Sequence, residues 1–198
     1  MSLLVTKPAP DFTATVVLPD NTFKEDFKLS DLRGKYVLLF FYPLNFTFVC
    51  PSEILAFNKA AKQFEDSNCQ IVAVSIDSHF SHLAWKNTPV NEGGIGNISY
   101  PLVSDLNKSI SRDYGVLLDA GIALRGLFLI DREGIIRHQV VNDLPLGRNV
   151  NEALRILHAL QFTEKHGEVC PANWNQGEDA MTPTAEGVAA YLTAHAND

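Results

Sequence analysis

The 198-residue sequence lacks long hydrophobic runs, runs of basic residues and targeting signals. No stretch approaches the roughly 18 consecutive apolar residues of a membrane span; the longest strong apolar run covers residues 36–42. The first ten residues contain one lysine and two prolines but no apolar core, which argues against a signal or transit peptide. The net charge of −7 argues against a nucleic-acid-binding surface. We therefore expect a cytoplasmic protein with neither membrane nor nucleic-acid partners.

Cysteine is also scarce: Cys50, Cys69 and Cys170 are the only three, and there is no CxxC pair. A chain of this length buries roughly 70% of the surface that its unfolded form exposes, so it can fold without disulfides or a metal. In the cytosol, cysteines are more often redox-active or metal-binding than joined in standing disulfides. We interpret Cys69, which precedes a predicted buried strand, as structural. Cys50 and Cys170 are candidates for chemistry.

Hydrophobic patterns predict a mixed sheet covered by helices. Residues 13–29 alternate around a turn and predict an N-terminal hairpin. The other predicted elements are strands at 36–42, 70–76, 100–103, 127–130 and 135–141, and helices from about 51, at 80–87 and at 150–165. The first strand, helix and second strand of this series form a parallel crossover, and the last two strands pair antiparallel. The expected fold class is α/β with a thioredoxin-like fold, although several small α/β folds share this plan.

The composition changes near residue 168. We assign residues 1–167 to the thioredoxin-like domain and residues 168–198 to a C-terminal arm that carries Cys170. The arm has several prolines and glycines and few apolar residues before a weak helix at 185–195. Such a segment must pack on something to be ordered.

Cys50 lies where a buried strand gives way to a helix that Pro51 opens. A side chain there faces the positive end of the helix dipole and its unpaired N–H groups, which favour a thiolate, the reactive form of cysteine. Thr47 can aim its hydroxyl at an oxygen atom beside the sulfur, and Pro43 can shield the pocket from water. The alternative, that Cys50 is merely a small buried apolar residue, explains neither neighbour.

The spacing Pro43-x-x-x-Thr47-x-x-Cys50, within FYPLNFTFVCPSE, resembles the active-site signature of the peroxiredoxin family, two-cysteine type. The resemblance implies a peroxidase in which Cys50 attacks hydrogen peroxide or an organic hydroperoxide and becomes a sulfenic acid. Donors such as Thr47 would stabilise the charge on the departing oxygen. No metal or organic cofactor is needed for this chemistry.

Two arginines belong to the same resemblance. Residues 121–131 are similar to the segment that carries the family's active-site arginine, here Arg125, which would hold the thiolate and polarise the peroxide. Arg148 matches a second family arginine that pairs with the glutamate at Glu53, and this pair would orient Arg125. Composition alone would make Arg125 a solvated loop residue, and Glu53 a first-turn acid that complements the helix dipole.

The region of Cys170, with Val169, Pro171 and Trp174, resembles the family's resolving-cysteine segment. The resemblance implies a disulfide between Cys170 of one subunit and Cys50 of its partner, which thioredoxin or a similar dithiol reductase would reduce. It also implies a homodimer across the edge strand at 135–141 and a decamer of five dimers. The alternative for Cys170 is a free surface thiol.

Two rival functions remain to be separated by experiment. A thiol–disulfide oxidoreductase could use the same fold, but the missing CxxC argues against it. A parallel chaperone or redox-relay role would not require peroxide turnover. We interpret His79 and His82 as surface histidines, since no cysteine or carboxylate completes a metal site with them.

Overall fold

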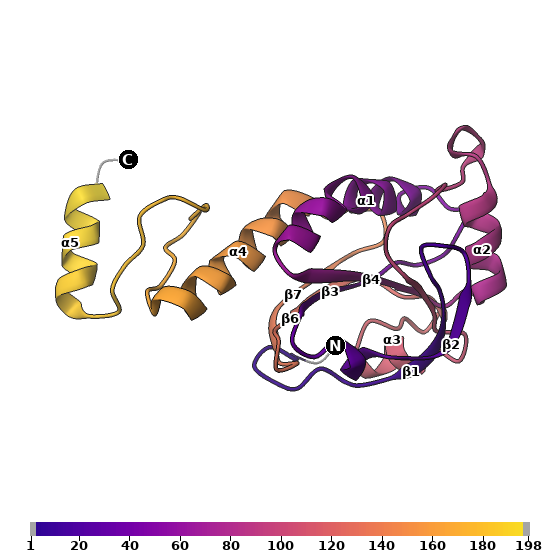
Figure 1. The fold of residues 1–198 in the computed structure, drawn as a ribbon, viewed down its shortest axis with the longest axis horizontal. Coiled ribbons are helices and arrows are strands. Elements are labelled where there is room, and N and C mark those ends of the chain that lie inside the picture. Colours follow the sequence, from indigo (N-terminus) through magenta and orange to yellow (C-terminus); the bar gives the residue numbers. More distant parts are fainter. Residues whose placement is uncertain (1–2, 196–198) are drawn as a thin grey trace. The chain divides into compact units, whose positions relative to one another are not determined.

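A seven-stranded mixed sheet organises the computed structural model, which describes residues 3–195 (Figure 1). The strands lie in the order β2-β1-β5-β4-β3-β6-β7. Their bounds are β1 Thr13–Val17, β2 Phe23–Lys28, β3 Tyr36–Phe41, β4 Cys69–Ser75, β5 Leu102–Ser104, β6 Arg125–Ile130 and β7 Ile136–Asn142. The predicted hairpin is β1 and β2, and it joins the same sheet through antiparallel pairing of β1 with β5. The predicted thioredoxin-like α/β class is confirmed.

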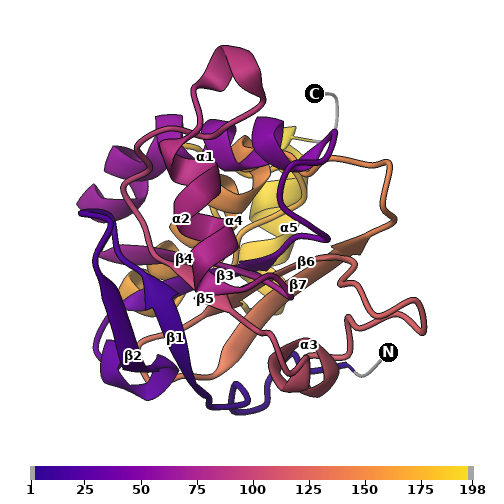
Figure 2. The same cartoon turned by 90° about the vertical axis from the view of Figure 1, so that its right-hand side faces the viewer.

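The helices are α1 Cys50–Asp66, α2 His79–Asn87, α3 Ser109–Asp113, α4 Val150–His166 and α5 Ala185–His195, with 3-10 turns at Leu29–Leu32 and Val90–Glu92. Within residues 3–195, no helix is long and apolar enough to cross a membrane. Strand β3 pairs parallel with β4, and β4 pairs parallel with β5. Because both crossovers step the same way and are right-handed, α1 and α2 cover one face of the sheet. Figure 2 shows α3 on the opposite face.

Strand β3 lies in the core between β4 and β6, and all six of its residues are buried. Successive side chains point to opposite faces of the sheet. Phe40 stacks on Phe57 of α1, with 4.6 Å between ring centroids, whereas Phe41 lies 5.2 Å from Tyr114, just after α3. Because β3 is packed on both faces, the loop that follows it begins at a fixed position, and so does α1 after the loop.

The chain forms two compact units, the first ending at Val150 and the second beginning at Asn151. In the second unit, Trp174 is buried, and its ring lies 5.0 Å from the ring of Phe162. Its indole N–H donates to the carbonyl of Glu178. A bridge between Val169 and Met181 closes the intervening loop. Within this unit, the arm predicted from composition is therefore ordered by its own loop contacts and by packing of Trp174 on α4.

Candidate active site

Cys50 is the first residue of α1, directly after the loop that leaves β3, as predicted. Its side chain is fully buried, and all three cysteines are free thiols. Pro51 follows in the first turn, where its missing N–H costs nothing. Val49 precedes the helix and offers no side-chain acceptor. The first-turn N–H groups and the positive end of the helix dipole are therefore directed toward the sulfur's end of the helix.

Two donors contact the sulfur of Cys50. The Thr47 hydroxyl lies 3.1 Å from Sγ and 2.8 Å from the carbonyl oxygen of Leu44. Because a hydroxyl has one hydrogen, Thr47 donates either to the carbonyl or to the sulfur, and a thiolate favours the second choice. Arg125 Nη1 lies 3.5 Å from Sγ on another side. The sulfur thus has one neutral and one cationic donor, both suited to an anion.

Arg125 is the first residue of β6 and is buried, so it is not a solvated loop residue. Its Nε donates to the carbonyl of Leu144 at 2.7 Å, and Nη1 donates to Glu53 Oε2 at 2.6 Å. Those bonds leave an Nη1 hydrogen directed at the sulfur of Cys50. The fixed fork of the guanidinium therefore bridges the carboxylate and the sulfur.

Glu53 holds a second arginine on its other side. Arg148 Nε and backbone N–H donate to Glu53 Oε1 at 2.7 and 2.9 Å, and Nη2 donates to Oε2 at 2.9 Å. Arg148 Nη1 donates to the carbonyls of Phe41 and Gly126, at 2.8 and 2.6 Å. One carboxylate therefore joins two buried guanidinium groups, one of which reaches the sulfur.

The ionisation of Glu53 follows from these contacts. Burial raises its pKa, but the hydrogen bonds and charge of Arg148, together with the charge of Arg125, outweigh burial and lower the pKa below its ordinary value. Burial also lowers the pKa of Arg148, while its hydrogen bonds to Glu53 oppose that shift. Arginine stays protonated in proteins. The three side chains therefore form a buried group with one negative and two positive charges.

The structure places the remaining predicted site residues as follows. Pro43 is buried just beyond the end of β3, in the same loop as Thr47. Cys170 lies in the second unit, half-buried, with its Sγ 3.7 Å from the carbonyl of Ala159 and 3.8 Å from the hydroxyl of Thr163. Cys50, Thr47, Arg125, Glu53 and Arg148 are brought together in the first unit.

The interpretation of His82 as a surface residue is wrong. Its side chain is fully buried in α2, and burial lowers its pKa to about 4, although the charge of Asp77 opposes the shift. Nε2 lies 3.1 Å from the carbonyl of Val103. The sequence-based interpretation assigned both histidines to the surface, but His82 faces the sheet. Within residues 3–195 no cluster of three potential ligands could hold a metal ion.

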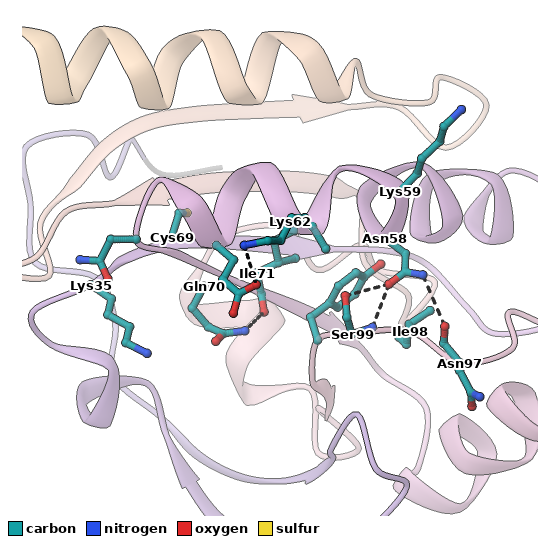
Figure 3. A pocket seen from close by; sticks show the side chains of 14 residues that line it. Lys35, Asn58, Lys59, Lys62, Cys69, Gln70, Ile71, Asn97, Ile98 and Ser99 are labelled. Atoms are coloured by element: carbon teal, nitrogen blue, oxygen red, sulfur yellow. Dashed lines mark hydrogen bonds and ion pairs between the residues drawn. The ribbon is translucent and has the colours of Figure 1, made fainter.

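Cys69 lies away from Cys50, in the lining of a cavity of about 650 Å³ between α1, the start of β4 and residues 97–100 (Figure 3). The residues lining this cavity do not include Cys50, Thr47 or Arg125. Burial raises the pKa of Cys69 to about 12, so its thiol stays protonated. This agrees with the structural role predicted for it.

Comparisons with known proteins identify relatives along nearly the whole chain. Residues 5–139 match the AhpC/TSA family, and residues 159–194 match the C-terminal domain of 1-Cys peroxiredoxin. A peroxiredoxin-1 from Gallus gallus is 58% identical over 188 residues, 94% of each chain. A peroxiredoxin-2 from Cricetulus griseus is 57% identical over 190 residues, 96% of this chain and 95% of that one.

Solved structures of similar proteins also superpose on most of this chain. The reduced 2-Cys peroxiredoxin of Plasmodium vivax superposes with a TM-score of 0.95 at 53% identity, covering 97% of this chain and 100% of that one. The AhpC of Enterococcus faecalis superposes with a TM-score of 0.79 at 36% identity, covering 86% and 100%.

Proposed function

Because this chain belongs to the AhpC/TSA family and is a peroxiredoxin, a thiol-dependent peroxidase, we propose that Cys50 is the sulfur that attacks the peroxide. The observation that carries this assignment is the pair of donors on its Sγ, Thr47 at 3.1 Å and Arg125 at 3.5 Å. Burial raises the pKa of Cys69 to about 12 despite a backbone hydrogen bond from Leu38, so Cys69 is unsuited to the role.

In the proposed first step, the Cys50 thiolate forms an S–O bond to one peroxide oxygen as the O–O bond breaks. The sulfur, oxidised by two electrons, becomes a sulfenic acid, and the other oxygen leaves with the bonding pair and gains a proton as water or an alcohol. Negative charge moves from sulfur to oxygen during this step. Thr47 and Arg125, already directed at the sulfur, can follow that charge without rearranging.

Glu53 and Arg148 act in this proposal through Arg125. The Glu53 carboxylate fixes Arg125 Nη1, and Arg148 holds the carboxylate against the main chain of β3 and β6. Pro43 shields the pocket, since it has no N–H to bind water. These residues position the donors and do not themselves touch the peroxide.

Recycling requires a second thiol. We propose that the arm over residues 168–198 brings Cys170 of one subunit to the Cys50 sulfenic acid of its partner, forming a disulfide and releasing water. An external dithiol, thioredoxin or a similar reductase, then reduces that disulfide, because this chain has no CxxC. The expected location is the cytoplasm, where such reductants keep thiols reduced.

The proposed homodimer would form along β7. This strand is the last in the sheet order, and an edge strand has a row of backbone groups available for pairing with another copy. Association of five such dimers into a decamer is the proposed larger assembly. Sedimentation of the reduced and oxidised protein would measure both states.

Stopped-flow peroxide reduction by wild type, Cys50→Ser and Cys170→Ser tests the proposal. Cys50→Ser should abolish the reaction, because serine offers no thiolate. Cys170→Ser should permit one turnover, leaving a sulfenic acid, but block recycling by thioredoxin. Peroxide consumption by Cys50→Ser at the wild-type rate would contradict the assignment of Cys50.

A further inference from the structure

The loop between β3 and α1 contains one buried polar side chain, Asn45, which is 7% exposed and bonds to other parts of the first unit. Its backbone N–H donates to Asp77 Oδ2 at 2.9 Å. Its Nδ2 donates to Ser81 Oγ at 2.9 Å and contacts His82 Nδ1 at 3.0 Å, while its Oδ1 accepts from the Tyr42 hydroxyl at 2.9 Å. The side-chain amide therefore connects the loop to the residue after β3 and to α2, and the backbone N–H connects it to the segment after β4.

The hydrogen positions in this network follow from one fixed acceptor. His82 Nε2 faces the carbonyl of Val103, so Nε2 must carry the proton and Nδ1 must accept. The lowered pKa of His82, about 4, agrees with a neutral ring. The amide NH₂ of Asn45, at 3.0 Å, is the nearest donor to Nδ1, and the Tyr42 hydroxyl lies farther away at 3.3 Å. With the NH₂ on that side, Oδ1 accepts from the hydroxyl of Tyr42 at 2.9 Å. Every polar atom of the Asn45 side chain then has a partner suited to it.

The next residue adds an independent observation. Phe46 has a φ of 51°, in the left-handed region that a bulky side chain rarely adopts. Such a conformation persists only when its surroundings hold it. Thr47 follows at once, and its hydroxyl is directed at Cys50 and at the carbonyl of Leu44. The strained residue thus lies between the buried anchor and the donor to the sulfur.

We propose that Asn45 is a positioning residue for the reaction at Cys50: its buried amide holds the strained loop that aims the Thr47 hydroxyl at the sulfur. This inference rests on the proposed role of Cys50 and assigns a function to a residue that makes no contact with the sulfur. The buried network of Tyr42 and His82 on the α2 side would then complement the Arg125–Glu53–Arg148 network on the β6 side.

The main test measures the second-order rate constant of Cys50 oxidation by hydrogen peroxide in Asn45→Ala. The substitution removes three side-chain hydrogen bonds but keeps the backbone bond to Asp77, so the loop is held less firmly and Thr47 loses its alignment. Misplacement of a reacting group by about 1 Å can slow a reaction about 100-fold, and we expect a loss of about 10- to 100-fold here. Ser81→Ala removes only one partner of the amide and should slow the reaction about threefold, which keeps the test open if Asn45→Ala does not fold.

Asn58→Ala is the matched control. Asn58 is also an asparagine that ties two elements together, accepting from the N–H and hydroxyl of Ser99, but it lies in the wall of the cavity in Figure 3. Its substitution should leave the rate constant within about twofold of wild type. An equal loss in Asn58→Ala, or a wild-type rate in Asn45→Ala, would overturn the inference. Failure of wild-type Cys50 to react at all would instead overturn the proposed function.

Asn45→Asp supplies a readout that general loosening would not produce. The introduced carboxylate should raise the pKa of His82, because an opposite charge favours the imidazolium. Asp77 adds to this effect and His79 opposes it. Burial raises the pKa of Tyr42 well above its ordinary value, so Tyr42 remains a neutral donor. As the pH falls from 8 to 5.5, His82 should gain a proton and restore the anchor. The ratio of variant to wild-type rate constants should rise over this range, and a flat ratio would contradict the assigned network.

Discussion

Replacing Glu53 with glutamine separates the charge of the buried network from its shape. Glutamine keeps one acceptor oxygen but turns the other into an NH₂ group that faces guanidinium hydrogens. In the wild type, Glu53 Oε2 accepts from Arg125 Nη1 at 2.6 Å and from Arg148 Nη2 at 2.9 Å. An NH₂ in place of Oε2 turns both of these contacts into a donor facing a donor, and an NH₂ in place of Oε1 does the same to the contacts of Arg148 Nε and backbone N–H. The two buried cations then lose the carboxylate that lies between them.

The size of the effect follows from the burial of all three side chains, which are between 1% and 4% exposed. Removing one partner from a buried ion pair costs about 3–5 kcal/mol, because the other charge stays buried and uncompensated. For a chain of this size, each kcal/mol corresponds to about 2–4 °C in melting temperature. We therefore expect Glu53→Gln to lower the melting temperature by about 6–20 °C at pH 7.

Thermal unfolding followed by circular dichroism, at fixed protein concentration, measures this loss. Asp66→Asn is the control on the same helix, because it removes an exposed ion pair with Lys62 and should leave the melting temperature nearly unchanged. A pH series adds a second criterion. Because the folded-state pKa of Glu53 is lowered, its contribution is present above the unfolded pKa of about 4.3 and is lost as pH falls through the folded value.

The difference in melting temperature between wild type and Glu53→Gln should therefore be constant near neutral pH and shrink in acid. A loss no larger than that of Asp66→Asn would refute the reasoning, since it would mean that the two arginines tolerate each other without the carboxylate. A difference that grows below pH 4 would refute the sign of the pKa shift.

Three further predictions concern single side chains. Thr47→Val removes the hydroxyl but keeps the shape, and it should slow peroxide reduction about 100-fold in stopped-flow assays. Thr47→Ser keeps the hydroxyl and should retain most activity. Equal losses in the two variants would show that the methyl group matters instead. Arg125→Lys should also lose at least about tenfold, because an ammonium cannot replace the planar fork that bridges a carboxylate and Cys50, and a wild-type rate would show that charge alone suffices. Cys69 should resist iodoacetamide at pH 8 until the protein is unfolded, since burial raises its pKa to about 12, and rapid labelling of the native protein, read by mass spectrometry, would contradict its burial.

The elements with strong periodicity could be predicted from the sequence to within a few residues. The doubly buried strand β3, the edge pair β6 and β7, and helix α4 all lie where their patterns indicated. Helix α3 was missed, because five residues are too few to show a period. Its first turn depends instead on the carboxylate of Asp105, which accepts from the N–H groups of Ile110 and Ser111. No local sequence pattern predicts such hydrogen bonds from a side chain outside the helix.

The same division applies to the site. The spacing of Thr47 and Cys50 is local, and the sequence alone placed both beside the helix start. Arg125 and Arg148 lie 72 and 95 positions from Glu53, and only resemblance to a family linked them. His82 was misplaced because one helical position decides whether a side chain faces solvent or sheet. Asn45 gave no signal, because asparagine is also an ordinary loop residue.

The two networks around Cys50 place a physical limit on how far the site can open for recycling. Cys50 is fully buried, so a disulfide with another chain requires the loop and the start of α1 to move. If only the residues before Glu53 move, the Glu53 carboxylate stays between its two arginines. Opening that includes Glu53 costs about 3–5 kcal/mol, which would reduce the open population at least 100-fold. The movable segment should therefore end within the first turn of α1, where Cys50 can turn outward while Arg125 stays fixed to β6.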